Sequence, residues 1–126
     1  MAVTVAVAAT DLGETLVDGD ARTLYVFDED TPGEPSTCTA ACADAWPPLV
    51  VDGAPVLGDG LDPAAFTTIT RPGGGAQLAV DGRPLYRFAG DADPGDTTGH
   101  GSQGLWWAVG PDGEPRPGSG SGGPGS

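Results

Sequence analysis

The chain has 126 residues, including 22 glycines and 13 prolines, and its 18 acidic side chains oppose only five arginines, for a formal charge of −13. This length is typical of one small domain, and such a charge repels nucleic acid and anionic membrane surfaces, so neither is an expected partner. No stretch reaches the roughly 20 consecutive apolar residues that a membrane span needs, so we do not expect direct membrane insertion.

The first segment, "MAVTVAVAAT", alternates Val3, Val5 and Val7 with small or polar residues. A period of two predicts a β-strand. The segment has no basic residues ahead of its apolar run, which argues against a secretory signal peptide. We therefore expect any export signal to be absent from this chain.

Two later segments each predict a strand, an Asp-Gly turn and a second strand: "LVDGDARTLYVF" (16–27) and "LAVDGRPLYRF" (78–88). In the second, Asp81-Gly82 is the dipeptide favoured by a two-residue type I′ turn, which would pair Val80 with Arg83. The segment "GLWWAVG" (104–110) predicts a further short strand.

The segment "STCTAACADAWPPL" (36–49) interrupts this pattern with a run of helix formers from Thr39 to Ala45. Pro47 and Pro48 forbid its continuation. We expect one short helix that carries the Cys-x3-Cys segment and delivers Trp46 to the core.

The two halves of the chain resemble each other. Both contain Leu-Tyr-x-Phe, then an acidic stretch and Pro-Gly, and in each half the tyrosine and the phenylalanine lie two residues apart, on one face of a strand. An internal duplication, with the aromatic faces turned to a shared core, is the simplest account.

The predicted fold is therefore mainly β: a small single domain of two pseudo-repeated β-hairpin units with one short helix. Residues 1–110 would form the duplicated module, with half-repeats at about 12–50 and 70–110. Residues 111–126, rich in Gly, Ser and Pro, predict a flexible linker or tail.

These features resemble the secreted-repeat lipoprotein family, whose motif is Tyr-x4-Asp. The motif residues here would be Tyr25, Phe27, Asp30, Tyr86, Phe88 and Asp91, and the likeness spans about residues 12–111, including Cys38, Cys42, Trp46, Asp81-Gly82 and Trp106. The family consists of predicted extracytoplasmic proteins of bacteria and archaea with no assigned activity. The resemblance implies export to the cell envelope or the extracellular space, often with a lipid anchor, although this chain shows no lipobox cysteine near its start.

Cys38 and Cys42 are the two cysteines of the chain. At i and i+4 of a helical turn they would lie on one face, and in an exported protein two nearby cysteines normally form a disulfide. The alternative is a redox dithiol, but this normally reads Cys-x-x-Cys in a positive environment, whereas Glu34 and Asp44 would raise the thiol pKa. A structural disulfide is the favoured interpretation.

The acidic loops have two interpretations. Alternate carboxylates beside a glycine turn can provide the oxygen ligands of Ca²⁺. Alternatively, aspartates close turns through backbone hydrogen bonds, and Asp30 and Asp91 would each accept backbone N–H bonds or the tyrosine hydroxyl as a local lock within their own repeat. The candidate metal ligands, for Ca²⁺ or a transition metal, are Asp28, Asp30, Glu34, Asp91, Asp93, Asp96 and His100.

His100, the single histidine, lies in a glycine-rich loop, and a lone histidine with two bridged cysteines does not complete a zinc site. Trp106 and Trp107 are adjacent in a predicted strand and so point to opposite faces. One of them could present a surface for a sugar or a protein partner, although burial of both would equally suit a small domain.

The sequence thus predicts a non-catalytic extracytoplasmic structural or binding module without a cofactor. A partner could be another envelope protein, or further domains joined through the C-terminal linker. The alternative functions are a divalent-cation binding protein that uses the acidic loops and a thiol-disulfide redox protein.

Overall fold

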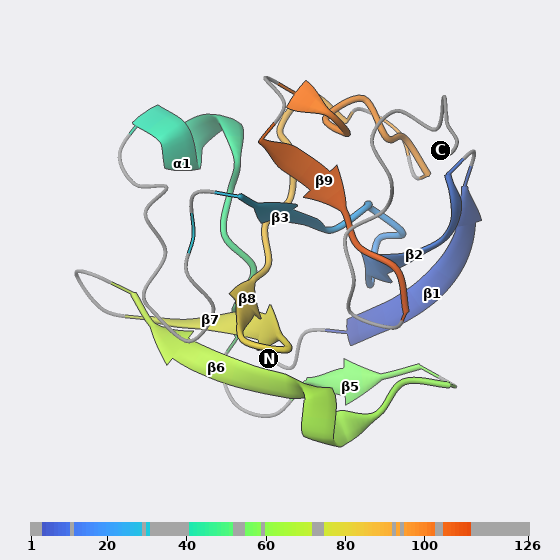
Figure 1. The fold of residues 1–126 in the computed structure, drawn as a ribbon, viewed down its shortest axis with the longest axis vertical. Coiled ribbons are helices and arrows are strands. Elements are labelled where there is room, and N and C mark those ends of the chain that lie inside the picture. Colours follow the sequence, from blue (N-terminus) through green and yellow to red (C-terminus); the bar gives the residue numbers. More distant parts are fainter. Residues whose placement is uncertain are drawn as a thin grey trace.

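The structure is a computed structural model, and it describes residues 4–10, 12–28, 30, 41–51, 55–58, 60–71, 75–91, 93, 95–102 and 105–111. Within these ranges the chain is mainly β with one short α-helix, as predicted (Figure 1). None of the helices in the described part has both the length and the apolar composition of a membrane span. Apart from Pro111, the predicted tail lies outside the described residues.

The elements follow one another along the chain as short strands around a single helical turn. They are β1 (Thr4–Thr10), β2 (Gly13–Asp18), β3 (Tyr25–Phe27), α1 (Ala41–Ala45), β4 (Val50–Val51), β5 (Val56–Leu57), the 3-10 helix η1 (Pro63–Ala65), β6 (Phe66–Thr70), β7 (Ala76–Val80), β8 (Arg83–Pro84) and β9 (Trp106–Ala108).

The strands form three small sheets in the described part of the chain. The first has the order β2-β1-β5, with β1 and β2 antiparallel and β5 parallel to β1. The second pairs β3 with β9, and the third has the order β4-β7-β6, with β8 also paired to β7. Figure 1 shows β3 and β9 near the centre, between the β1–β2 hairpin on one side and β6, β7 and β8 on the other.

The turn between β7 and β8 has the predicted geometry. Asp81 and Gly82 both have positive φ, at 51° and 82°, which a type I′ turn requires at its two central residues. The register places Val80 opposite Arg83, as the Asp-Gly dipeptide predicts. Gly82 suits this position because it adopts a left-handed backbone without a steric penalty.

The described helix lies within the predicted run of helix formers. It covers Ala41–Ala45, while Thr39 and Ala40 lie outside the described residues. The Trp46 amide still donates to the Cys42 carbonyl at 2.8 Å, which completes the turn before Pro47 and Pro48 end it. Trp46 is buried, as expected.

Corresponding residues of the two halves make corresponding backbone hydrogen bonds. The Leu24 amide donates to the Leu16 carbonyl at 2.9 Å, and the Leu85 amide donates to the Leu78 carbonyl at the same distance. In each half a third residue, which follows a tryptophan, bonds to both of these leucines. In the first half it is Val109, which accepts from the Leu16 amide and donates to the Leu24 carbonyl. In the second half it is Leu49, which accepts from the Leu78 amide and donates to the Leu85 carbonyl.

The interior contains two clusters. One is aliphatic and combines valines and leucines of β1, β2, β4 and β7 with Leu24, Leu61, Leu85 and Val109. The other is aromatic: Tyr25, Trp46, Tyr86 and Trp106, with Phe27 and Phe88 packed against them. The two tyrosines are fully buried in this shared cluster, as the face pattern predicted. The aromatic cluster lies where the two halves meet, and it holds the polar residues of the motif.

Candidate functional site

Four rings form a continuous stack at the junction of the halves. Trp46 and Trp106 lie face to face, with centroids 3.8 Å apart and an interplanar angle of 1°. Phe27 stacks on the outer face of Trp106, and Phe88 stacks on the outer face of Trp46, each with centroids 4.2 Å apart. The stack therefore alternates between rings from distant parts of the chain, and it holds the halves together.

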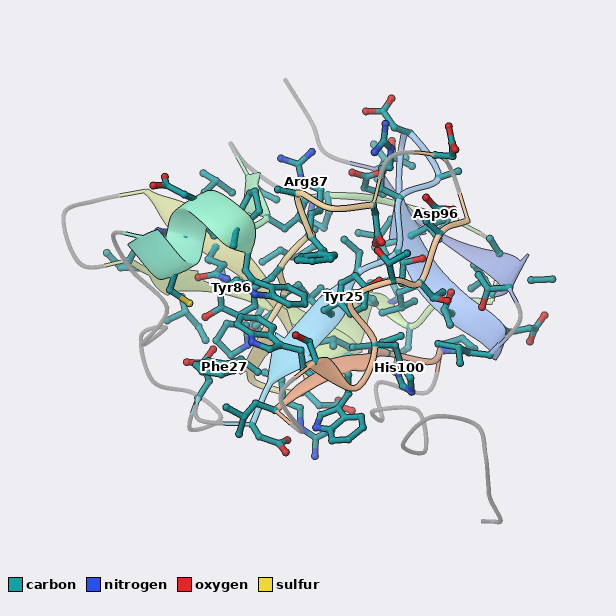
Figure 2. All side chains as sticks on the ribbon, turned by 90° about the horizontal axis from the view of Figure 1, so that it is seen from above. Tyr25, Phe27, Tyr86, Arg87, Asp96 and His100 are labelled. Carbon is teal, nitrogen blue, oxygen red and sulfur yellow. The ribbon has the colours of Figure 1, made fainter. Side chains whose placement is uncertain are left out.

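The two tyrosines pack edge-on against this stack. Tyr25 meets Trp46 at 5.4 Å and 82°, and Tyr86 meets Trp106 at 5.0 Å and 87°. Edge-to-face contacts of this kind stabilise a fold by about 0.5–1.5 kcal/mol each beyond the area buried. Figure 2 shows both tyrosines in the middle of the molecule, with Phe27 beside them.

The main chains of the two tyrosines pair directly with each other. The Tyr25 amide donates to the Tyr86 carbonyl at 2.8 Å, and the Tyr86 amide donates to the Tyr25 carbonyl at 2.9 Å. This isolated antiparallel bridge is reciprocal, so the two residues have the same relation to each other.

The hydroxyl groups of the tyrosines cross between the halves. The Tyr25 hydroxyl donates to Asp91 Oδ2 at 2.7 Å, across 66 residues of sequence. The Tyr86 hydroxyl donates to Asp30 Oδ2 at 2.5 Å, across 56 residues. The prediction that each aspartate accepts its own repeat's tyrosine, as a local lock, is therefore wrong: the partner comes from the other half. We call these two hydrogen bonds the crossed pairs.

A short turn in each half explains the crossing. The Asp30 amide donates to the Phe27 carbonyl at 3.0 Å, and the Asp91 amide donates to the Phe88 carbonyl at 3.1 Å. Each turn begins at the phenylalanine of its motif. The carboxylate is thereby directed at the tyrosine of the opposite half.

Asp91 is the more deeply buried of the two acceptors, with 2% of its surface exposed. Its Oδ1 accepts from the Thr98 amide at 3.0 Å and from the Thr98 hydroxyl, so three donors compensate its burial. Burial, together with the hydrogen bond to Asp91 and the charge of Asp91, raises the pKa of Tyr25 well above its ordinary value. Tyr25 is therefore a neutral donor.

The other candidate metal ligands have hydrogen-bonding roles of their own. Asp28 accepts from Trp107 Nε1 at 2.8 Å, and Asp96 accepts from the Asp93 amide at 3.0 Å. His100 Nδ1 accepts from the Ala108 amide at 3.0 Å. Glu34 lies outside the described residues, and within the described ranges no three His, Cys, Asp or Glu side chains form a set that could hold a metal ion. The Ca²⁺ interpretation stays a prediction.

The cysteines and the tandem tryptophans are placed only in part. Cys42 packs against the aromatic cluster from α1, whereas Cys38 lies outside the described residues, so the disulfide also stays a prediction. The two adjacent tryptophans differ in their exposure. Trp106 is buried within the ring stack. Trp107 is half-buried, and its ring meets His100 edge-on at 5.5 Å, so it is the one of the two that reaches the surface.

The sequence interpretation missed Thr98 and Gly99, which close the site. The Gly99 amide lies 3.4 Å from the Tyr25 hydroxyl. A Cβ on Gly99 would approach Trp46 Cη2 to 2.6 Å and Phe88 Cδ2 to 2.9 Å, closer than real Cβ contacts. The signal was the dipeptide Thr98-Gly99 a few residues after the motif aspartate, which reads as an ordinary turn.

Comparison with known families finds two matched segments in this chain, and each crossed pair joins one segment to the other. A family model described as a secreted repeat of unknown function matches residues 6–50 and 67–110. The first segment contains Tyr25 and Asp30, and the second contains Tyr86 and Asp91. No curated protein and no solved structure matches the chain.

Double-mutant cycles test the crossing. The combination of Tyr25→Phe with Asp91→Asn should show a coupling of about 0.5–3 kcal/mol in the free energy of unfolding, as should Tyr86→Phe with Asp30→Asn. The pairs within one motif, Tyr25→Phe with Asp30→Asn and Tyr86→Phe with Asp91→Asn, are the matched controls and should be close to additive. Urea denaturation measures all four cycles, and a larger coupling within a motif than across the halves would contradict the assignment.

The substitution Gly99→Ala should destabilise the fold, because the added methyl group would overlap Trp46 and Phe88. Overpacking of this kind costs about 1–3 kcal/mol. The control is Gly19→Ala, whose Cβ would meet Thr4 Cβ at an ordinary 3.4 Å. Equal urea midpoints for the two variants would show that Gly99 is not in tight contact with the stack.

Alkaline pH should destabilise the wild type through Tyr25. Its pKa is raised in the folded state, so unfolded chains lose the phenolic proton first, and the free energy of unfolding should fall as the pH rises above about 10. Tyr25→Phe should lower the free energy of unfolding at pH 7, but this free energy should then fall less steeply with rising pH than in the wild type. Urea titrations at pH 8 to 11.5 measure it, and the lack of lysine leaves few other groups titrating there. An unchanged slope in Tyr25→Phe would refute the assignment.

Proposed function

The chain belongs to the family of secreted repeats of unknown function, and from that premise we propose that it is a non-catalytic structural or binding module of the extracytoplasmic space. The observation that carries this proposal is the crossing of the motif hydrogen bonds. The residues that define each repeat are used to close one repeat on the other.

The environment of the motif residues supports a structural role. A catalytic tyrosine or aspartate must reach a substrate, directly or through one water molecule. Tyr25 and Tyr86 are fully buried, and each hydroxyl already donates to a carboxylate. The raised pKa of Tyr25 also keeps its hydroxyl neutral, which is unfavourable for a base or a nucleophile.

The proposal includes a pseudo-twofold relation between the repeats, each of them one β unit. The reciprocal bridge between Tyr25 and Tyr86, the matched ring stacks and the recurring leucine hydrogen bonds support this relation. It also includes a Cys38–Cys42 disulfide, which would fix α1 and with it Trp46, the central ring of the stack. In this proposal the sequence 111–126 connects the module to a partner in the envelope or to further domains.

Surface digestion tests the location and the role together. In intact cells of the native host, an externally added protease should remove the protein while a cytoplasmic marker survives. In Tyr25→Phe and Tyr86→Phe strains, the surface amount should follow the folded fraction measured in vitro, and it should recover at lower growth temperature because marginally stable chains are cleared by proteolysis.

Two outcomes would overturn the proposal. Full protection of the wild type both in intact cells and in cells whose outer envelope is permeabilised, with the cytoplasmic marker still protected, would place it inside the cytoplasm. A Tyr25→Phe chain that is folded and as abundant as the wild type, yet reproduces the phenotype of deleting the gene, would show that the hydroxyl does more than stabilise the fold.

A further inference from the structure

A pocket of about 310 Å³ lies beside the aromatic cluster, where the turn after β2 meets the segment after β8. Asp20 and Arg22 line it from the first half together with Pro47, and the segment Arg87–Ala89 lines it from the second half with Asp91. In Figure 2, Arg87 lies above the two tyrosines, whereas Phe27 and His100 lie below them. We call this the Arg22–Arg87 pocket.

The pocket brings together two of the few cationic side chains of the sequence, and Asp20 and Asp91 line it beside them. The whole sequence contains five arginines and no lysine, and two of the arginines line this one pocket. They are 65 positions apart in the sequence, so the packing of the two halves brings them together. Two guanidinium groups in one concave site favour an anionic ligand.

Each guanidinium is anchored through one amino group. Arg22 Nη1 donates to the Asp91 carbonyl. Arg87 Nη1 lies 3.5 Å from Asp18 Oδ2, and Asp18 Oδ1 accepts from the amides of Asp20 and Arg22. A single buried carboxylate thus organises both sides of the pocket.

The protein leaves most donors of these arginines unused. A guanidinium carries five N–H groups. Within the described residues, the side chains of Arg22 and Arg87 each make one polar contact, and the buried Arg87 Nε has no hydrogen-bond partner. The side chain of Arg87 is 42% exposed, so its outer amino groups can reach a ligand.

The rest of the pocket wall is apolar and rigid. Phe88 stacks on Trp46 with centroids 4.2 Å apart. The main chain on either side of it is held at 2.8 Å by two hydrogen bonds, from the Arg87 amide to the Pro47 carbonyl and from the Ala89 amide to the Ala45 carbonyl. A preformed apolar wall beside hydrogen-bonding groups is the usual composition of a small-molecule site.

Three carboxylates near the pocket limit the ligand: Asp18, which already faces Arg87 and the amides of Asp20 and Arg22, and the two lining residues Asp91 and Asp20. The Asp91 side chain is turned to Tyr25 and Thr98, so its carbonyl, not its carboxylate, faces Arg22. Asp20 is exposed at the rim, and its charge opposes an anion. The pocket volume is at the low end of the range of about 300–1,000 Å³ for ligand sites. A small, singly charged ligand therefore fits best.

We propose that the Arg22–Arg87 pocket binds a small monocarboxylate with an apolar body, its carboxylate held by the two guanidiniums and its apolar part against Pro47, Phe88 and Ala89. Arginine suits this role because its planar donors match the two carboxylate oxygens. The inference rests on the proposed function, which it deepens by giving the module a ligand class.

Titration of the full chain with benzoate at low ionic strength and pH 7 tests the proposal, by calorimetry or amide chemical shifts. Binding should saturate in the millimolar range, at a Kd on the order of 1 mM. Arg22→Gln and Arg87→Gln should each weaken it by about tenfold, and Asp20→Asn should strengthen it several-fold because a repulsive charge is removed. Benzamide, the neutral analogue, should not bind.

Arg71→Gln is the matched control, because it removes the same charge from the turn after β6, and it should leave the affinity unchanged. If either pocket variant fails to fold, two milder variants test the proposal instead. Arg22→Lys should weaken the affinity for benzoate, and the surface variant Asp20→Asn should strengthen it. Absence of saturation, equal binding of benzamide, or equal weakening by Arg71→Gln would overturn the proposal. None of these results would change the outcome of the surface digestion, so the ligand and the proposed function can fail separately.

Discussion

The two buried tyrosine hydroxyl groups each need a hydrogen-bond acceptor, and the junction of the two halves is built around supplying it. Tyr25 and Tyr86 are fully buried, and a phenolic hydroxyl in an apolar interior costs stability unless it donates a hydrogen bond. Neither repeat supplies the acceptor for its own tyrosine; Asp91 serves Tyr25, and Asp30 serves Tyr86. The tyrosine hydroxyl of each half therefore has its hydrogen-bond acceptor only when the other half is in place.

The ring stack adds the apolar part of the same junction. Trp46 and Trp106 stack on each other, and each of them also stacks on a phenylalanine of the motif. The main chain at Gly99 packs closely against this stack, and it can do so because glycine has no Cβ to overlap Trp46. The Arg22–Arg87 pocket depends on this junction too, since Phe88 forms both its wall and one end of the stack.

Local patterns in the sequence predict the local parts of this structure. The valine alternation predicts β1, the Asp81-Gly82 dipeptide predicts a type I′ turn, and the spacing of Tyr25 and Phe27 predicts a buried face. The crossed pairs could not be predicted in the same way, because the five-residue spacing of the motif suggests a partner nearby. Which tyrosine an aspartate reaches depends on how the two halves pack, and a local sequence pattern does not predict this packing. The meeting of Arg22 and Arg87 escaped prediction for the same reason.

The crossing has a consequence for the origin of such a chain. Because each tyrosine is paired with the aspartate of the other half, a lone repeat could form the crossed pairs only with a second copy of itself. Two copies that exchange equivalent contacts form an isologous dimer, the commonest symmetric assembly of soluble proteins. Gene fusion of such a dimer yields one chain in which either half is free to diverge, provided that its tyrosine and aspartate keep serving the other.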